Sequence, residues 1–111
     1  MSDKQYNGLG LNEYQVEAMS FRLESATPEY AMLGLSGEVG ELHSLISKAY
    51  RDGRKMDHDL NVKKELGDIL WFVAAIAMDH GYTLEEIAEK NLSKLSARKS
   101  NGTLQGSGDT R

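Results

Sequence analysis

The sequence predicts an all-α fold: a four-helix, bundle-like single domain that forms an oligomer. Apolar residues recur at spacings of three and four through most of the chain, as on the buried face of a helix. Helix start and stop signals divide this pattern into four segments. A length of 111 residues is enough for one small hydrophobic core but not for two.

The first two predicted helices lie in the N-terminal half. An irregular, turn-rich arm precedes a helix over residues 12–25, with Asn12 as its N-cap. Thr27 and Pro28 mark a second start, because threonine caps a helix well and proline is tolerated at its first position. This second helix is expected to continue to about Arg51.

The last two predicted helices follow a glycine-containing loop. The third covers residues 59–80 and ends at Gly81, and its second half is apolar all round, which is typical of a central, buried helix. The sequence Thr83-Leu84-Glu85-Glu86 is a capping box that opens a fourth helix ending near Lys99. The predicted organisation is therefore an arm over residues 1–11, a helical domain over 12–99 and a glycine-rich tail over 100–111.

Composition excludes several functional classes. A net charge of −4 argues against a broad nucleic-acid surface, and the absence of cysteine excludes disulfides, thiolate metal sites and cysteine nucleophiles. The longest apolar run, Ile69 to Met78, is shorter than the roughly 20 residues needed to span a bilayer. No apolar segment typical of a secretory signal is visible near the N-terminus. We therefore expect a soluble, cytoplasmic protein with neither nucleic-acid nor membrane partners.

Two acidic pairs lie inside the apolar helices. Glu38 and Glu41 share one face of the second helix, and Glu65 and Asp68 share one face of the third. If these helices pack together, four carboxylates converge, and two charges about 4 Å apart repel by about 4 kcal/mol at an effective dielectric of 20. Bound protons or cations would relieve this repulsion, and oxygen ligands without cysteine favour Mg²⁺ or Mn²⁺. The alternative is that the pairs belong to solvated helix faces.

Glycines accompany these acids. Gly34, Gly37, Gly40 and Gly67 fall inside predicted helices, where each costs about 1 kcal/mol relative to alanine. A helix tolerates glycine where another group must approach its backbone closely. The group is either the acidic site or a neighbouring helix.

The motifs GLSGEVGEL, KKELGDILWFVAAIA and KNLSKLSAR follow one another in the chain. In this order they resemble the MazG-like nucleotide pyrophosphohydrolases of the all-α NTP pyrophosphatase superfamily, over about residues 12–98. The resemblance implies hydrolysis of a nucleoside triphosphate between the α and β phosphates, giving a monophosphate and pyrophosphate. Phosphoryl chemistry of this kind depends on positioning and on charge neutralisation, which metal ions supply.

The resemblance also implies roles for individual residues. Its acidic motifs would hold Mg²⁺ through Glu38, Glu41, Glu65 and Asp68. Glu41 is in addition the candidate for the base that activates the attacking water. The candidates for substrate binding are Lys48, Asn91, Lys94 and Arg98. Without the resemblance, Lys94 and Arg98 would be ordinary solvated charges favoured by a helix C-terminus.

Other positions leave alternatives open. Some relatives carry a glutamate where this chain has Lys64, so the number of metal ions is not fixed. Trp71 stands where the family often has an aromatic residue and serves either core packing or base stacking. The glycine-rich tail either closes over a nucleotide, using its backbone N–H groups and Arg111, or is disordered.

The resemblance further implies a homodimer or homotetramer, because the family builds its sites between subunits. Two alternatives to a (d)NTP pyrophosphohydrolase remain. One is a non-catalytic helical module that binds nucleotide and metal, and the other is a relative that acts on phosphoribosyl-ATP. The sequence leaves the preferred base and sugar open.

Overall fold

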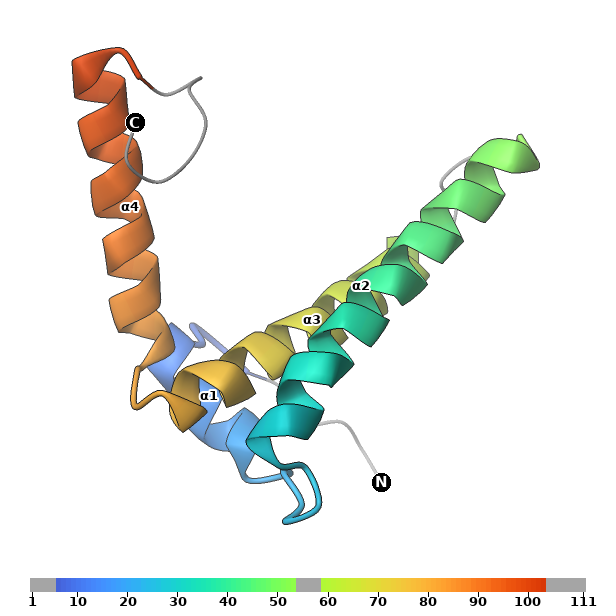
Figure 1. The fold of residues 1–111 in the computed structure, drawn as a ribbon, viewed down its shortest axis with the longest axis horizontal. Coiled ribbons are helices and arrows are strands. Elements are labelled where there is room, and N and C mark those ends of the chain that lie inside the picture. Colours follow the sequence, from blue (N-terminus) through green and yellow to red (C-terminus); the bar gives the residue numbers. More distant parts are fainter. Residues whose placement is uncertain (1–5, 54–58, 104–111) are drawn as a thin grey trace.

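A computed structural model describes residues 6–53 and 59–103 of the chain (Figure 1). It confirms an all-α protein with four helices, and no strand occurs within the described ranges. The helices, in chain order, are α1 (Leu11–Met19), α2 (Pro28–Arg51), α3 (Asp59–Asp79) and α4 (Leu84–Asn101).

The helices form two diverging arms (Figure 1). Helices α2 and α3 run side by side in opposite directions and make the most extensive contact between any two helices. Helix α1 packs against α3 and against the beginning of α4. The rest of α4 projects away from the α2–α3 pair, so the four helices do not close into a bundle within one chain. None of the helices described is long and apolar enough to cross a membrane.

Local signals place most helix ends where the sequence predicts them. The Thr27 hydroxyl accepts a hydrogen bond from the Tyr30 N–H at 3.2 Å, and Pro28 is the first residue of α2. At the start of α4, the Thr83 hydroxyl accepts from the Glu86 N–H at 3.1 Å, and the Glu86 carboxylate accepts from the Thr83 N–H at 3.0 Å. The predicted capping box is confirmed.

The first helix is shorter than expected, and its predicted end at Ser25 is wrong. Helix α1 ends at Met19, and the chain then turns across the end of α3. Arg22 holds this turn: its Nε donates to the Ala26 carbonyl, and its guanidinium forms a two-bonded ion pair with Asp79, each bond 2.9 Å long. A bidentate pair of this kind favours the turn over continued helix.

The predicted N-cap of the first helix is also wrong, because α1 begins one residue earlier, at Leu11. The Asn12 side chain bonds to the start of α4: its amide donates to the Glu85 carboxylate at 2.9 Å and accepts from the Glu85 N–H at 3.0 Å. Helix α4 continues to Asn101, two residues beyond its predicted end, and Gly102 follows with a φ of 69°.

Buried Gln15 joins three helices. Its amide nitrogen donates to the carbonyls of Ala74 in α3 and of Tyr82 before α4, at 3.2 and 3.1 Å. Its amide oxygen accepts from the N–H of Leu84 at 3.0 Å. Gln15 therefore fixes the root of α4 to the other two helices.

The core is small and made mainly of small side chains. Its buried apolar residues are Ala18, Ala31, Ala49, Phe72, Ala74, Ala75, Ala77 and Leu84. Helix α3 is central, as predicted, but it is not buried all round within one chain, since Leu66 and Met78 are more than half exposed. The expected tail conformation beyond Thr103 lies outside the described residues, as does the proposed contact of Arg111 with a nucleotide.

Candidate functional site

Three of the four predicted acidic residues meet between α2 and α3. Glu38 comes from α2, and Glu65 and Asp68 come from successive turns of α3. Carboxylate oxygens of these three side chains all lie within 4.8 Å of one another. We call this group the acid trio. It forms because α2 and α3 pack along their length and each presents its acidic face to the other.

The trio is electrostatically unfavourable on its own. Burial raises the pKa of Glu38, and its hydrogen bond with Glu65 and the charge of Asp68 raise it further. The Oε2 atom of Glu65 is buried and has no hydrogen-bond partner among the described residues. A buried carboxylate oxygen without a donor is costly, and a cation is the natural partner for it. Oxygen-only ligands of this kind fit a hard divalent ion.

Glu41 does not belong to the trio. It lies in α2 on the margin of a polar pocket of about 210 Å³ that Glu65 also lines. Lys48, the fifth predicted site residue on this arm, lines the same pocket. Three further polar residues line it that were not predicted as site residues, namely Ser44, Asn61 and Lys64. Asn61 had a sequence signal, because it lies four residues before Glu65 and thus on the same helix face.

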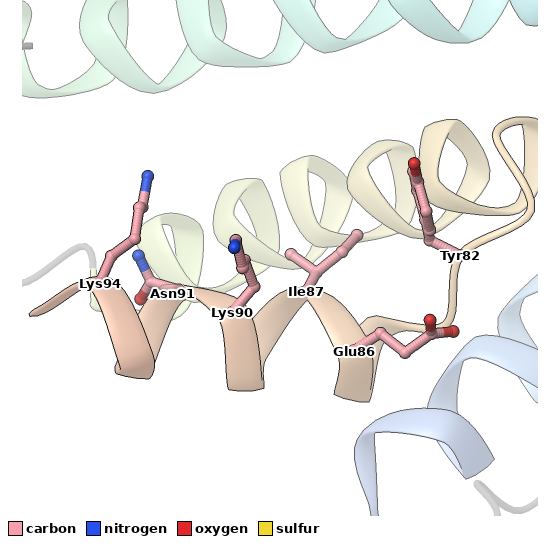
Figure 2. Close-up of a pocket in the computed structure, with 6 residues that line it drawn as sticks. All are labelled: Tyr82, Glu86, Ile87, Lys90, Asn91 and Lys94. Carbon is pink, nitrogen blue, oxygen red and sulfur yellow. The ribbon is translucent and has the colours of Figure 1, made fainter. Parts of the chain in front are cut away.

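The predicted substrate-binding residues of α4 lie elsewhere. Asn91 and Lys94 line a pocket of about 530 Å³ along one side of α4, together with Lys90 (Figure 2). Arg98, further along the same helix, is only 7% exposed. Because α4 diverges from the α2–α3 pair, the described structure does not bring these residues to the acid trio within one chain.

The helical glycines divide into two groups. A Cβ atom on Gly34 would collide with the Phe72 ring, so this glycine serves close packing between α2 and α3. At Gly37, Gly40 and Gly67 a Cβ would meet nothing within 4 Å in the described structure. Helix packing therefore explains Gly34, and contacts within one chain do not explain the other three.

Tyr14 and Trp71 extend the site toward α1. Burial raises the pKa of Tyr14 in α1, and the charge of Asp68 raises it further. The Trp71 indole N–H donates to the Ala18 carbonyl at 2.9 Å, and its ring meets Phe72 edge-on with centroids 5.2 Å apart. These contacts give Trp71 a packing role. No local signal could have paired Tyr14 with an acid 54 positions away.

Comparison with known proteins decides the family. The model of the MazG nucleotide pyrophosphohydrolase domain matches residues 26–103. The chain belongs to the MazG family. The matched MazG segment begins just before α2 and includes both acidic motifs and α4.

One curated relative supports this membership. The chain is 39% identical over 85 residues to the "Gene 37 protein" of Mycobacterium phage L5, an alignment that covers 74% of this chain and 75% of that protein. No solved structure matches the chain significantly. The relative's name states no activity, so the family alone connects this MazG chain with nucleotide hydrolysis.

Proposed function

We propose that this protein hydrolyses (d)NTPs between the α and β phosphates, releasing a nucleoside monophosphate and pyrophosphate, and that it depends on Mg²⁺, with Mn²⁺ as a substitute. Membership of the MazG family supports the reaction class. The observation that carries the proposal is the acid trio, with its buried and unpartnered Glu65 oxygen.

The acid trio supplies the ligands for the metal. Glu38, Glu65 and Asp68 offer only carboxylate oxygens, which Mg²⁺ prefers, together with water and phosphate oxygens. A divalent ion held there neutralises charge on the substrate phosphates and positions them. Its charge would also relieve the repulsion that raises the pKa of Glu38.

Glu41 is assigned the role of general base. It lies next to the trio but outside the 4.8 Å group, so its carboxylate remains available to accept a proton from the attacking water. Lys48 shares the polar pocket with Glu41 and can neutralise a phosphate oxygen there. In this proposal the acid trio binds the metal and Glu41 acts as the base, whereas the resemblance implies both roles for Glu41.

Asn91, Lys94 and Arg98 act on the substrate only if α4 reaches an acid trio, which requires a second copy of the chain. We therefore propose a homodimer or homotetramer in which α4 of one subunit completes the site of another. Large apolar side chains exposed on both arms support association, because water-exposed leucines are unfavourable in such numbers. Examples with more than half their surface exposed are Leu33, Tyr50, Leu66 and Leu92.

The test is product analysis with each (d)NTP in the presence of Mg²⁺. Monophosphate and pyrophosphate are expected, and chelation of the metal should stop their release. Glu41→Gln and Asp68→Asn should lower kcat at least about a hundredfold with the helical content unchanged. The exposed carboxylate of Glu13 on α1 provides the control, since Glu13→Gln should keep full activity.

Three outcomes would contradict the proposal. Diphosphate and phosphate as products would show cleavage at a different bond. Binding of nucleotide and metal without turnover would indicate a non-catalytic module. Turnover of phosphoribosyl-ATP alone would assign the same metal chemistry to a different substrate.

A further inference from the structure

Two lysines line the polar pocket between α2 and α3. Lys48 comes from α2 and Lys64 from α3, and the carboxylates among the lining side chains are those of Glu41 and Glu65. Because Glu65 also belongs to the acid trio, the polar pocket and the proposed metal site share one wall. The two lysines therefore contribute positive charge directly beside the proposed metal site.

Lys64 is placed beside two members of the trio. It directly precedes Glu65 in α3, and Asp68 follows it by four residues, which brings Lys64 and Asp68 to the same face of the helix. Its ammonium is a compact point charge on a flexible four-carbon stem. Lys64 thus adjoins both the polar pocket and the trio.

Neither lysine is neutralised by a single acid. No carboxylate oxygen in residues 6–53 and 59–103 lies within 4.0 Å of the amine of Lys48 or Lys64. Their charge acts across the pocket that they line, as the charge of a bound ion would. This arrangement differs from the paired charges of Arg22 and Asp79 at the other end of α3.

The formal charges between α2 and α3 match a single divalent ion. The acid trio and Glu41 contribute four negative charges when ionised, and Lys48 and Lys64 contribute two positive charges. The remaining two negative charges equal the charge of one divalent ion in magnitude. A second divalent ion would leave an excess of positive charge beside two ammonium groups that repel it.

The polar pocket is the place where a second ion would otherwise bind. Its two carboxylates are Glu41 and Glu65, and in two-metal sites the ions lie about 3.5–4 Å apart, close enough to share a ligand such as Glu65. The Lys64 ammonium lines this same pocket and has three N–H donors but no acceptor. It offers positive charge and hydrogen bonds to anionic oxygens where a metal would offer coordination.

We propose that Lys64 takes the place of a second divalent ion, so that the carboxylates between α2 and α3 bind one such ion per chain. This inference rests on the proposed function for the assignment of the trio to the metal, and it adds the number of ions and the role of Lys64. The polar pocket then receives a covalently held positive charge that does not depend on the metal concentration.

The stoichiometry of Mn²⁺ binding tests this inference without turnover. The whole protein is titrated with Mn²⁺ in the absence of nucleotide, and the EPR signal of the free ion gives the bound amount. Wild type should bind one ion per chain, whereas Lys64→Glu, which exchanges the ammonium for a carboxylate ligand, should bind two. Lys63→Glu is the control: it makes the same change of charge at the neighbouring exposed residue, which does not line the pocket, and should bind one.

A neutral substitution decides the question if the additional acid of Lys64→Glu prevents folding. Lys64→Gln should tighten binding of the single Mn²⁺ ion about two- to fivefold at low ionic strength, which is the effect of removing one like charge within about a Debye length. Lys63→Gln should change the affinity less, because its side chain lies outside the pocket. Circular dichroism establishes that each variant keeps the helical content of wild type.

Three results would overturn the inference: two ions bound by wild type, one ion bound by both folded glutamate variants, or equal affinities of Lys64→Gln and Lys63→Gln. Absence of Mn²⁺ binding by wild type would reject the metal site itself, and with it both proposals. One ion in wild type and two in Lys64→Glu, without hydrolysis of any (d)NTP, would reject the proposed reaction alone.

Discussion

Individual carboxylates set the electrostatic character of the MazG chain's proposed metal site. Glu38 is the residue on which the effects converge, since burial, a hydrogen bond with Glu65 and the charge of Asp68 all raise its pKa. A raised carboxyl pKa means that the folded state binds a proton more tightly than the unfolded chain does. Without metal, folding is therefore penalised at neutral pH by ionisation of this group.

This penalty predicts the effect of Glu38→Gln on the metal-free protein. The stability that protonated Glu38 contributes is present below the unfolded pKa, near 4, and is lost as the pH rises through the folded pKa. The variant should therefore be more stable than wild type at neutral pH, and the difference should shrink toward about pH 4. Urea denaturation with a chelator at both pH values measures this, and a pH-independent difference would contradict it.

The close contact between α2 and α3 at Gly34 predicts the effect of adding one methyl group there. A Cβ at this position meets the buried Phe72 ring, and overpacking of this kind costs about 1–3 kcal/mol, more than the helix propensity gained. Gly34→Ala should lower the free energy of unfolding. Gly37→Ala, where a Cβ meets nothing within 4 Å, should raise it by up to about 1 kcal/mol. Thermal denaturation compares the two, and equal effects would refute the explanation.

At the scale of the helices, hydrogen bonds between distant segments determine how α4 is attached. Gln15 binds groups of α3 and of the α4 root at once, and Asn12 binds Glu85 at the first turn. These contacts are confined to the beginning of α4. The orientation of this helix thus depends on a few polar side chains of α1.

Gln15→Met is the variant that tests this attachment. Methionine is close to glutamine in shape, but it leaves the buried carbonyl and N–H partners of Gln15 without hydrogen bonds. This loss costs about 1–3 kcal/mol of stability. The free energy of unfolding should fall by that amount, and amide exchange in the first turn of α4 should accelerate. Glu13→Met on the exposed side of α1 is the control. Similar unfolding free energies for the two variants would show that Gln15 does not hold α4.

Helix boundaries show which structural information is local. The caps at Thr27 and Thr83 act within three residues, so the sequence predicted the starts of α2 and α4. The early end of α1 depends on Arg22 and Asp79, which are 57 residues apart, and no sequence window includes both. The acid spacing similarly predicted which carboxylates share a helix face, but not that Glu41 stands outside the trio.

At the scale of the whole molecule, the two arms leave much apolar surface uncovered, and we expect association. Sedimentation equilibrium should give a mass of at least twice the 12.3 kDa of one chain. Leu92→Lys, at a side chain that is 66% exposed on α4, should weaken association, whereas Ser93→Lys beside it should not. A monomer at micromolar concentration would contradict both the oligomer and the completion of the site by α4.

Sequence periodicity predicted the helices but not the divergence of the arms. An apolar helix face has the same sequence pattern whether another part of the chain or another subunit covers it.

The attachment of α4 only at its root has a mechanical consequence. Eighteen residues of helix form a rod about 27 Å long. A tilt of about ten degrees at its base displaces the far end by roughly 5 Å, as follows from that length. The angle at the base, where Gly81 has a φ of 79° and the α1 side chains bind the first turn, is common to Asn91, Lys94 and Arg98. A substitution at the base of α4 would therefore displace all three proposed substrate-binding side chains together, without altering any of them.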